Sequence, residues 1–230
     1  MQVRSEAGGV FRSIIQLCAP STRFWVLRSL LAAEPRRFWS SPPPPAVASF
    51  ILHAIKDEVA SALDTVPGAA ADVNPPNPFG TTRVLEILAL CKAACATGGL
   101  GELYHQSASV SASENVLRGK AADLTSSRIV EQADVLLSCL NLLRFVLIRD
   151  RTGHADGTRG RTGVGDRSYQ RALRQEVVLP LQLRLELLQA ALGRLSAEHG
   201  HEHAAWAQTR VGMVALVSDA ILEMLPGLGE

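Results

Sequence analysis

The sequence lacks several features that would assign a functional class at once. Only 5% of its 230 residues are aromatic, and 23 basic residues are matched by 22 acidic ones, so charge alone does not make the whole chain a nucleic-acid binder. No apolar run reaches the roughly 18 residues of a membrane-spanning helix. Alternating strand patterns with Asn-Gly or Asp-Gly hairpin turns are also absent, which excludes an ordinary β-sheet domain.

Cysteine is sparse, and its placement argues against a disulfide framework. The four cysteines lie scattered through apolar stretches, which is typical of buried thiols in a reducing compartment. Cys91 and Cys95 are four residues apart on an expected helix, but a zinc site needs four ligands and no second Cys or His pair has a useful spacing. We therefore expect no metal site and a cytoplasmic or nuclear location. The cysteines are Cys18, Cys91, Cys95 and Cys139.

Catalytic signatures are missing as well. There is no nucleophile elbow, no His-Glu-x-x-His pair and no dinucleotide-binding fingerprint. The glycines from 157 to 165 lack the Gly-Lys-Ser/Thr ending of a phosphate-binding loop. His199, His201 and His203 alternate at a helix junction, where a solvated turn is favoured over a metal-chelating cluster. We expect a protein that is not an enzyme and has no cofactor.

What the sequence does contain is helical periodicity. Apolar residues make up 47% of the chain, and they recur at spacings of three and four, which predicts an all-α fold. The strongest pattern predicts a helix over 127–150 with Ser127 as its N-cap. A leucine stripe predicts another helix over 171–198, with a kink or late start at Pro180. The stripe consists of Leu181, Leu185, Leu188, Leu192 and Leu195, and further helices are expected over 51–63, 81–96, 114–118 and 204–225.

These helices indicate one domain over residues 42–230, with loops at 66–80 and 151–167. The second loop contains Gly, Arg, Thr and Asp without an apolar pattern, so we interpret it as a mobile surface loop. Helices that cannot bury their apolar sides alone indicate stacked antiparallel hairpins of the HEAT or armadillo kind, as in part of an α-solenoid. Residues 1–41 are expected to form two short helices, over 10–18 and 21–33. Six arginines against two acids in residues 1–40 also fit an organellar transit segment.

Local charge gives the clearest hint of a binding surface. From Arg144 to Arg184 there are nine arginines and four acidic residues. Guanidinium groups pair well with carboxylates, so this stretch is a candidate docking surface for an acidic partner. It equally fits a solvated helix face with a flexible loop, or a surface that binds RNA or another polyanion. Few aromatic residues argue against stacking on single-stranded nucleic acid.

Two segments resemble a known family. SCLNLLRFVLIRD, from Ser138 to Asp150, is followed by a polar loop and then by VLPLQLRL, from Val178 to Leu185. This order resembles the C-terminal region of glomulin and its plant counterpart, the aberrant lateral root formation protein. Residues 204–225 are similar to the last helix of that family, and residues 50–63 are more weakly similar to an earlier one. The good match covers about 100 residues.

The resemblance implies a partner and a function. Proteins of this family are helical-repeat inhibitors that grip the RING subunit of cullin-RING ubiquitin ligases and block access of the ubiquitin-conjugating enzyme. From polarity we expect Asn141, Arg144, Arg149 and Arg184 to face the partner first. The positions of this chain that match the family pattern are Asn141, Arg144, Phe145, Arg149, Pro180, Leu181 and Arg184.

Overall fold

The computed structural model describes residues 2–32, 43–64, 76–97, 128–152, 160–199 and 202–226, and everything regular in these ranges is helical, with no strand. The prediction of an all-α fold is confirmed. The α-helices are α1 (Gln2–Gln16), α2 (Pro20–Ala32), α3 (Pro45–Asp64), α4 (Val84–Thr97), α7 (Arg128–Glu131), α8 (Ala133–Thr152), α9 (Arg167–Leu173), α10 (Leu179–His199) and α11 (Glu202–Met224). A 3₁₀-helix, η1 (Pro78–Gly80), precedes α4, and a π-helical turn, η5 (Arg174–Val178), joins α9 to α10.

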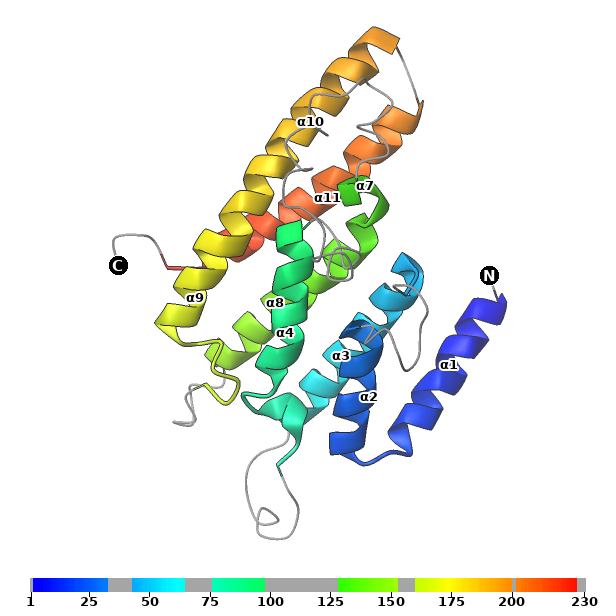
Figure 1. The fold of residues 1–230 in the computed structure, drawn as a ribbon, viewed down its shortest axis with the longest axis vertical. Coiled ribbons are helices and arrows are strands. Elements are labelled where there is room, and N and C mark those ends of the chain that lie inside the picture. Colours follow the sequence, from blue (N-terminus) through cyan, green and yellow to red (C-terminus); the bar gives the residue numbers. More distant parts are fainter. Residues whose placement is uncertain are drawn as a thin grey trace, which may run out of the picture.

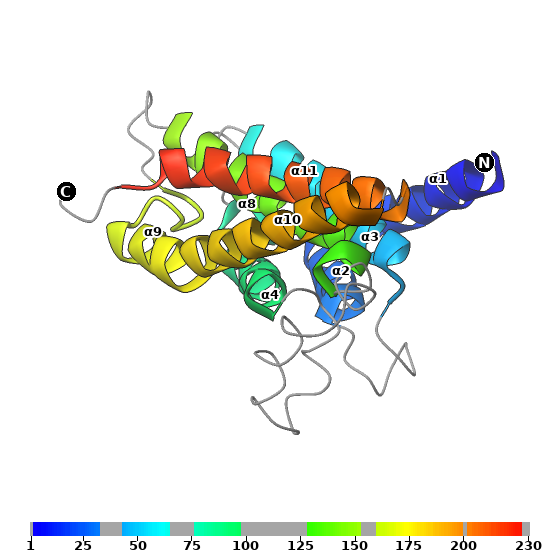
Figure 2. The same ribbon diagram turned by 90° about the horizontal axis from the view of Figure 1, so that it is seen from above.

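The longer helices form two layers. Helices α2, α4 and α10 lie in one layer, and α3, α8 and α11 lie in the other (Figures 1 and 2). Consecutive long helices alternate between the layers, so α2–α3, α4–α8 and α10–α11 are antiparallel hairpins placed side by side. Helix α1 lies at the edge beside α2 and α3 (Figure 1).

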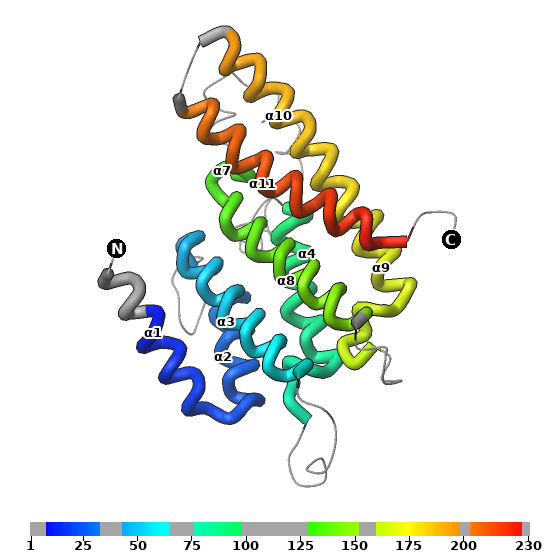
Figure 3. Tube along the Cα trace, turned by 180° about the vertical axis from the view of Figure 1, so that it is seen from behind, coloured from blue at the N-terminus to red at the C-terminus, as the bar shows by residue number. Residues whose placement is uncertain are grey.

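Neighbouring helices within one layer run in the same direction. Near its C-terminal end α3 contacts the C-terminal part of α8, through an ion pair between Asp64 and Arg149. Near their N-terminal ends α8 and α11 are joined by an ion pair between Asp134 and Arg210 at 2.6 Å. Figure 3 shows the three helices side by side and parallel. In this position α8 packs against α3 and α11 of its own layer and against α4 of the other layer.

The core lies between the two layers. On α8 the leucines expected on the apolar side, Leu136, Leu140, Leu143 and Leu147, are buried together with Cys139 and Val146, whereas Leu137, also expected there, is only partly buried. On α10 the predicted leucine stripe also faces the core, with all but Leu195 fully buried. Burying a leucine side chain is worth about 1.5–3 kcal/mol, so these two stripes supply much of the driving force that holds the hairpins together.

The first two helices pack onto the remainder of the molecule through aromatic rings. Phe24 of α2 is fully buried and meets Phe79 of η1 edge-on, with ring centroids 5.2 Å apart. Phe11 of α1 meets Phe50 of α3 at 5.4 Å. The helices expected over 10–18 and 21–33 are therefore present, although α1 begins well before residue 10.

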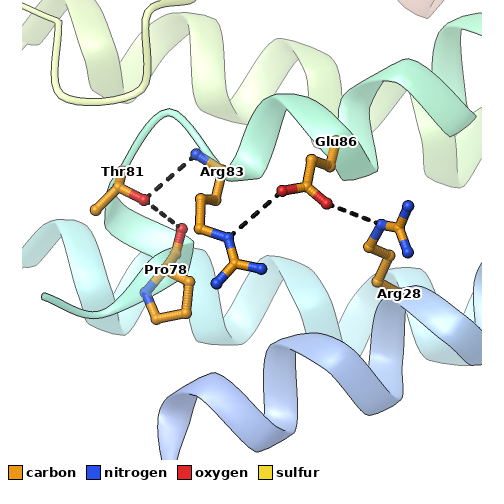
Figure 4. A network of polar contacts seen from close by, with 5 residues as sticks. All are labelled: Arg28, Pro78, Thr81, Arg83 and Glu86. Carbon is orange, nitrogen blue, oxygen red and sulfur yellow. Dashed lines mark hydrogen bonds and ion pairs between the residues drawn. The ribbon is translucent and has the colours of Figure 1, made fainter. Parts of the chain in front are cut away.

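The end of the first predicted loop is not a loop. Pro78, Phe79 and Gly80 form η1 and are all buried, so the interpretation of residues 66–80 as a loop is wrong at its end. Thr81 caps the start of the next helix: its hydroxyl donates to the Pro78 carbonyl at 3.0 Å and accepts from the Arg83 N–H at 3.3 Å. Figure 4 shows two ion pairs beside this turn. The carboxylate of Glu86 pairs with Arg83 at 3.4 Å and with Arg28 of α2 at 3.0 Å.

The expected irregularity at Pro180 takes the form of a π-helical turn. Proline has no backbone N–H to donate to the carbonyl four residues earlier, and its ring crowds that carbonyl. Here the turn over 174–178 widens before the proline, and the Leu179 N–H donates to the carbonyl of Arg174, five residues back. The long helix from α9 to α10 therefore continues without a break while Val177 and Val178 stay buried.

The second predicted loop, over 151–167, is folded at its C-terminal end. Thr162 and Val164 are buried, and the carboxylate of Asp150, also buried, accepts the N–H groups of Thr162 at 3.4 Å and Gly165 at 2.8 Å. Gly160 and Gly163 adopt positive φ angles of 57° and 76°, which other residues rarely do. The interpretation as a mobile loop is therefore wrong for residues 160–166, because a single carboxylate satisfies backbone groups that would otherwise need water.

Some predictions fall outside the described residues. These are the N-cap at Ser127, the short helix over 114–118, the glycines before residue 160 and the middle of the histidine-rich junction.

Candidate partner-binding face

The four predicted partner-binding residues of α8 lie together on its outer side. Arg144 is exposed, while Asn141, Phe145 and Arg149 are half-buried. Their spacing of three to four residues places them on successive turns of one helical face. This face is opposite the buried leucines, so it points away from the core.

Contacts with α3 occupy one flank of this group. The ammonium of Lys56 lies over the Phe145 ring at 5.3 Å, and Arg149 pairs with Asp64 while its guanidinium lies 5.9 Å from the same ring. These cation–π and ionic contacts hold Phe145 and Arg149 against α3. Phe145 and Arg149 therefore stabilise the packing of α8 on α3, whether or not a partner is bound.

Arg144 lies on the other flank, toward α11. Within the described part of the chain its guanidinium forms no hydrogen bond or ion pair. An exposed guanidinium with no partner in the fold retains all of its donors for a carboxylate outside it.

Two polar contacts fix the spacing of α8 and α11 at the ends of this flank. At one end Asp134 pairs with Arg210, whose guanidinium also lies 4.7 Å from the centre of the Trp206 ring. At the other end Arg151 donates to the carbonyl of Met224. The segment of surface between these contacts is held by both helices and is therefore rigid.

Exposed apolar side chains lie on the outer sides of both helices of this flank. Ile148 of α8 is 38% exposed, and Met213 and Leu216 of α11 are 44% and 70% exposed. An arginine without an ion-pair partner among the described residues, on a surface that also exposes large apolar groups, resembles the composition of an interface hot spot, in which Arg and bulky residues anchor the partner. We call this surface the α8–α11 face, made of Leu137, Asn141, Arg144, Ile148, Met213 and Leu216.

The predicted residues of α10 are not part of this face. Leu181 is buried in the core, and Arg184 donates to the carbonyl of Ala96 in the last turn of α4. Pro180 is half-buried next to the π-helical turn. Because α8 and α10 belong to different layers, the expectation of one continuous arginine surface over both helices is wrong (Figure 2).

Several arginines of the basic stretch instead cap helix C-termini. Arg174 donates to the carbonyls of Leu222 and Leu225 at 3.3 and 3.2 Å, and Arg151 reaches the adjacent carbonyl of Met224. The last carbonyls of a helix have no partner within it and carry a partial negative charge. Guanidinium groups from neighbouring helices supply both the donors and the opposite charge.

The sequence interpretation missed the α11 residues of the face. Met213 and Leu216 are apolar but fall outside the stripe of Val211, Val214 and Ile221, which is buried. Apolar residues at positions that helical periodicity places away from the core are the signal that could have identified them.

Three thiols lie in the core rather than near this face. Cys91, Cys95 and Cys139 are fully buried, whereas Cys18 is half-exposed. A hydrogen bond with Cys91 and burial raise the pKa of Cys139, and burial raises the pKa of Cys95. Protonated buried thiols are poor nucleophiles, so these side chains act as core residues, as the sequence indicated. Among the described residues, no group of three or more His, Cys, Asp and Glu could hold a metal ion.

Comparisons with known proteins add no relative. No family model, no curated protein and no solved structure matches the chain. Across the part of the chain that the structure describes, none of the helices combines the length and the apolar character that crossing a membrane requires.

Proposed function

We propose that the chain is a non-enzymatic protein-binding module whose partner docks on the α8–α11 face. The observation that supports this proposal is the exposed Arg144, which has no ion-pair partner among the described residues and lies on α8 with the exposed Ile148, while Met213 and Leu216 are exposed on the adjacent α11. A partner segment that combines a carboxylate with apolar residues fits this chemistry. Desolvating the ion pair beside apolar side chains strengthens it relative to an ion pair in water.

We further propose that the three hairpins are repeats of the HEAT or armadillo kind. Alternation between two layers, with parallel neighbours in each layer, is the arrangement that such repeats form. Solenoids of this type use rigid helical surfaces to bind other proteins, which is consistent with docking on one layer.

The resemblance of residues 138–150 and 178–185 to glomulin suggests the identity of the partner. On this proposal the chain binds the RING subunit of a cullin-RING ubiquitin ligase and inhibits ubiquitin transfer by excluding the conjugating enzyme. The contact then involves Asn141 and Arg144, and it does not involve Leu181 or Arg184, whose side chains are used within the fold.

Binding of RNA or another polyanion has less support. At least four of the nine arginines in the basic stretch are bonded to a carboxylate or to backbone carbonyls of the described residues, namely Arg149, Arg151, Arg174 and Arg184. A polyanion would have to compete with these contacts, whereas a docked protein needs only the α8–α11 face.

The direct test is to mix the purified chain with a cullin-bound RING subunit and to measure co-elution and ubiquitin transfer. We expect a stable complex and slower transfer. Free elution of both proteins with unchanged transfer would exclude this partner.

A substitution tests the face itself. Arg144→Glu reverses the charge opposite the expected carboxylate, and we expect it to weaken binding by at least about 2 kcal/mol, more than tenfold in Kd. Titration calorimetry measures the change. The matched control is Arg171→Glu, a charge reversal at an exposed position of α9 outside this face. Equal affinity of the two variants, with native helicity, would remove Arg144 from the site.

A further inference from the structure

Helix α10 has a second row of leucines that faces solvent. Leu179, Leu183 and Leu187 follow one another at intervals of four residues and are 36%, 59% and 51% exposed. An exposed apolar row of this length on a helix is unusual for a surface that stays in water. We call this row, with its flanking residues Glu176, Ala190 and Arg194, the α10 ridge.

The ridge faces away from both helices that pack on α10. Gln182 contacts Asp219 of α11, and Arg184 contacts the end of α4, so the two neighbours cover other sides of the helix. The α10–α11 hairpin is also the last in the stack of described helices (Figure 1). Nothing in the described part of the chain packs on the ridge.

We propose that the α10 ridge binds the same ridge of a second copy of this chain, with the two helices antiparallel about a two-fold axis that passes between Leu183 and Leu187, at the level of Leu185. This pairing sets Leu183 of each copy against Leu187 of the other. It also sets Glu176 of each copy opposite Arg194 of the other, since both are nine residues from Leu185. A two-fold interface requires such self-complementarity.

The charges at the two ends of the ridge favour this occupant. Glu176 is exposed and has no ion-pair partner within the described residues. Arg194 is exposed, and its Nε donates to the carbonyl of Ala190 at 3.3 Å, which leaves both terminal amino groups available. Antiparallel pairing forms two Glu–Arg pairs around an apolar centre, whereas parallel pairing would place like charges together.

The area of the α10 ridge determines the affinity that we expect for the dimer. A helix of 21 residues spans about 30 Å, and a strip one helix wide covers less than the roughly 800 Å² per partner of a standard tight interface. The dimer is therefore reversible, with dissociation in the micromolar range. The α8–α11 face lies in the other layer, so dimerisation through the α10 ridge leaves that face accessible. The dimer proposal therefore does not depend on the proposed function.

Sedimentation equilibrium of the full chain over a range of concentrations tests the proposal. The expected result is a rise from a monomer of 24.6 kDa toward twice that mass. Leu183→Glu places a charge at the apolar centre, and we expect it to raise the dissociation constant more than tenfold. Ile14→Glu, at a 57% exposed apolar residue of α1 at the opposite edge of the stack, is the control and leaves association unchanged.

A charge-swap cycle distinguishes this two-fold pairing from unspecific association. Glu176→Arg and Arg194→Glu are each expected to weaken the dimer several-fold, because each places like charges opposite each other. The double variant restores the pairs with reversed polarity and recovers most of the affinity. Circular dichroism establishes that each variant is helical. A monomer at every soluble concentration, or a Leu183→Glu variant that associates like the wild type, would overturn the proposal.

Discussion

Two buried thiols of the core and a partly buried tyrosine beside it make the fold less stable at alkaline pH. Burial raises the pKa of Cys95 and Tyr169, and a hydrogen bond with Cys91 together with burial raises that of Cys139. Unfolding returns these groups to ordinary pKa values near 8.5 for thiols and 10 for tyrosine. The folded state then holds more protons than the unfolded state above those values, so stability that is fully present below about pH 8.5 is lost as pH rises.

A measurable slope follows from this difference. We expect the free energy of unfolding, measured with urea under reducing conditions, to fall by about 1.4 kcal/mol per pH unit for each such group above its unfolded pKa. Cys95→Ala removes one of the groups and should flatten the slope between pH 9 and 10. Cys18→Ala, at a half-exposed position, serves as the comparison. Identical slopes for both variants would show that Cys95 does not contribute.

At the scale of the residue, the sequence indicated which apolar side chains are buried, but not which groups a polar side chain contacts. Burial of Cys91, Cys95 and Cys139 followed from their apolar surroundings in the sequence, and burial of most α8 leucines followed from periodicity, whereas the expectation was wrong for Cys18, which is half-exposed, and for Leu137, which is partly buried. The contacts of Asp150 did not follow from the sequence, although a carboxylate in the last turn of a helix is disfavoured by the helix dipole and was a sign of another role. Its role is to accept backbone N–H groups of a turn more than ten residues away, and such a contact leaves no periodic trace in the sequence.

At the scale of the helix, arginine caps connect one hairpin to the next. Arg174 caps α11 from the π-helical turn before α10, and Arg184 caps α4 from α10. Part of the arginine-rich stretch therefore serves the fold, because these guanidinium groups meet the partial negative charge at the ends of neighbouring helices.

Removing one cap should have a defined cost. Arg174→Ala eliminates two charge-assisted hydrogen bonds from a half-buried site, and we expect the free energy of unfolding to fall by about 1.5–3 kcal/mol. Urea denaturation measures the loss. Arg171→Ala, at an exposed position one turn earlier, should change stability by less than about 0.5 kcal/mol. A loss for Arg171→Ala as large as that for Arg174→Ala would contradict the capping role.

Helix positions could be predicted more accurately than the connections between them. The stop of the last helix before Pro226 and the irregularity before Pro180 have direct chemical causes in proline, and both are present. The 3₁₀-helix at Pro78–Gly80 was not predicted, because its burial depends on the Phe24 ring of a helix far away in the sequence.

At the scale of the whole molecule, side-by-side hairpins give a graded stability. Helix α8 packs against α3, α4 and α11, whereas α1 lies at the edge. In stacked repeats each unit is stabilised mainly by its neighbours, so interior helices open least often. We expect backbone amides of α8 to exchange with deuterium most slowly and those of α1 most rapidly, as measured by mass spectrometry of peptides. Uniform exchange across these helices would indicate a single cooperative unit.

The candidate face illustrates what a sequence cannot supply at this scale. Arg144 and Asn141 were identified from a polar interruption in an apolar helix, and they do lie on an outer surface. Arg184 was grouped with them because it belongs to the same arginine-rich stretch and to the second segment that resembles glomulin. The assignment of α8 and α10 to different layers depends on the order in which helices pack, and helical periodicity contains no information about that order.

The alternating layers also determine how the molecule acts at a distance. Peptide dipoles of α3, α8 and α11 point one way and those of α2, α4 and α10 point the other, so their axial fields largely cancel. With 23 basic and 22 acidic side chains, no strong monopole replaces them. For the partner proposed above, we therefore expect no long-range attraction. Association should proceed by unguided diffusion, at a rate that depends little on ionic strength, and selectivity should arise only after the two molecules touch.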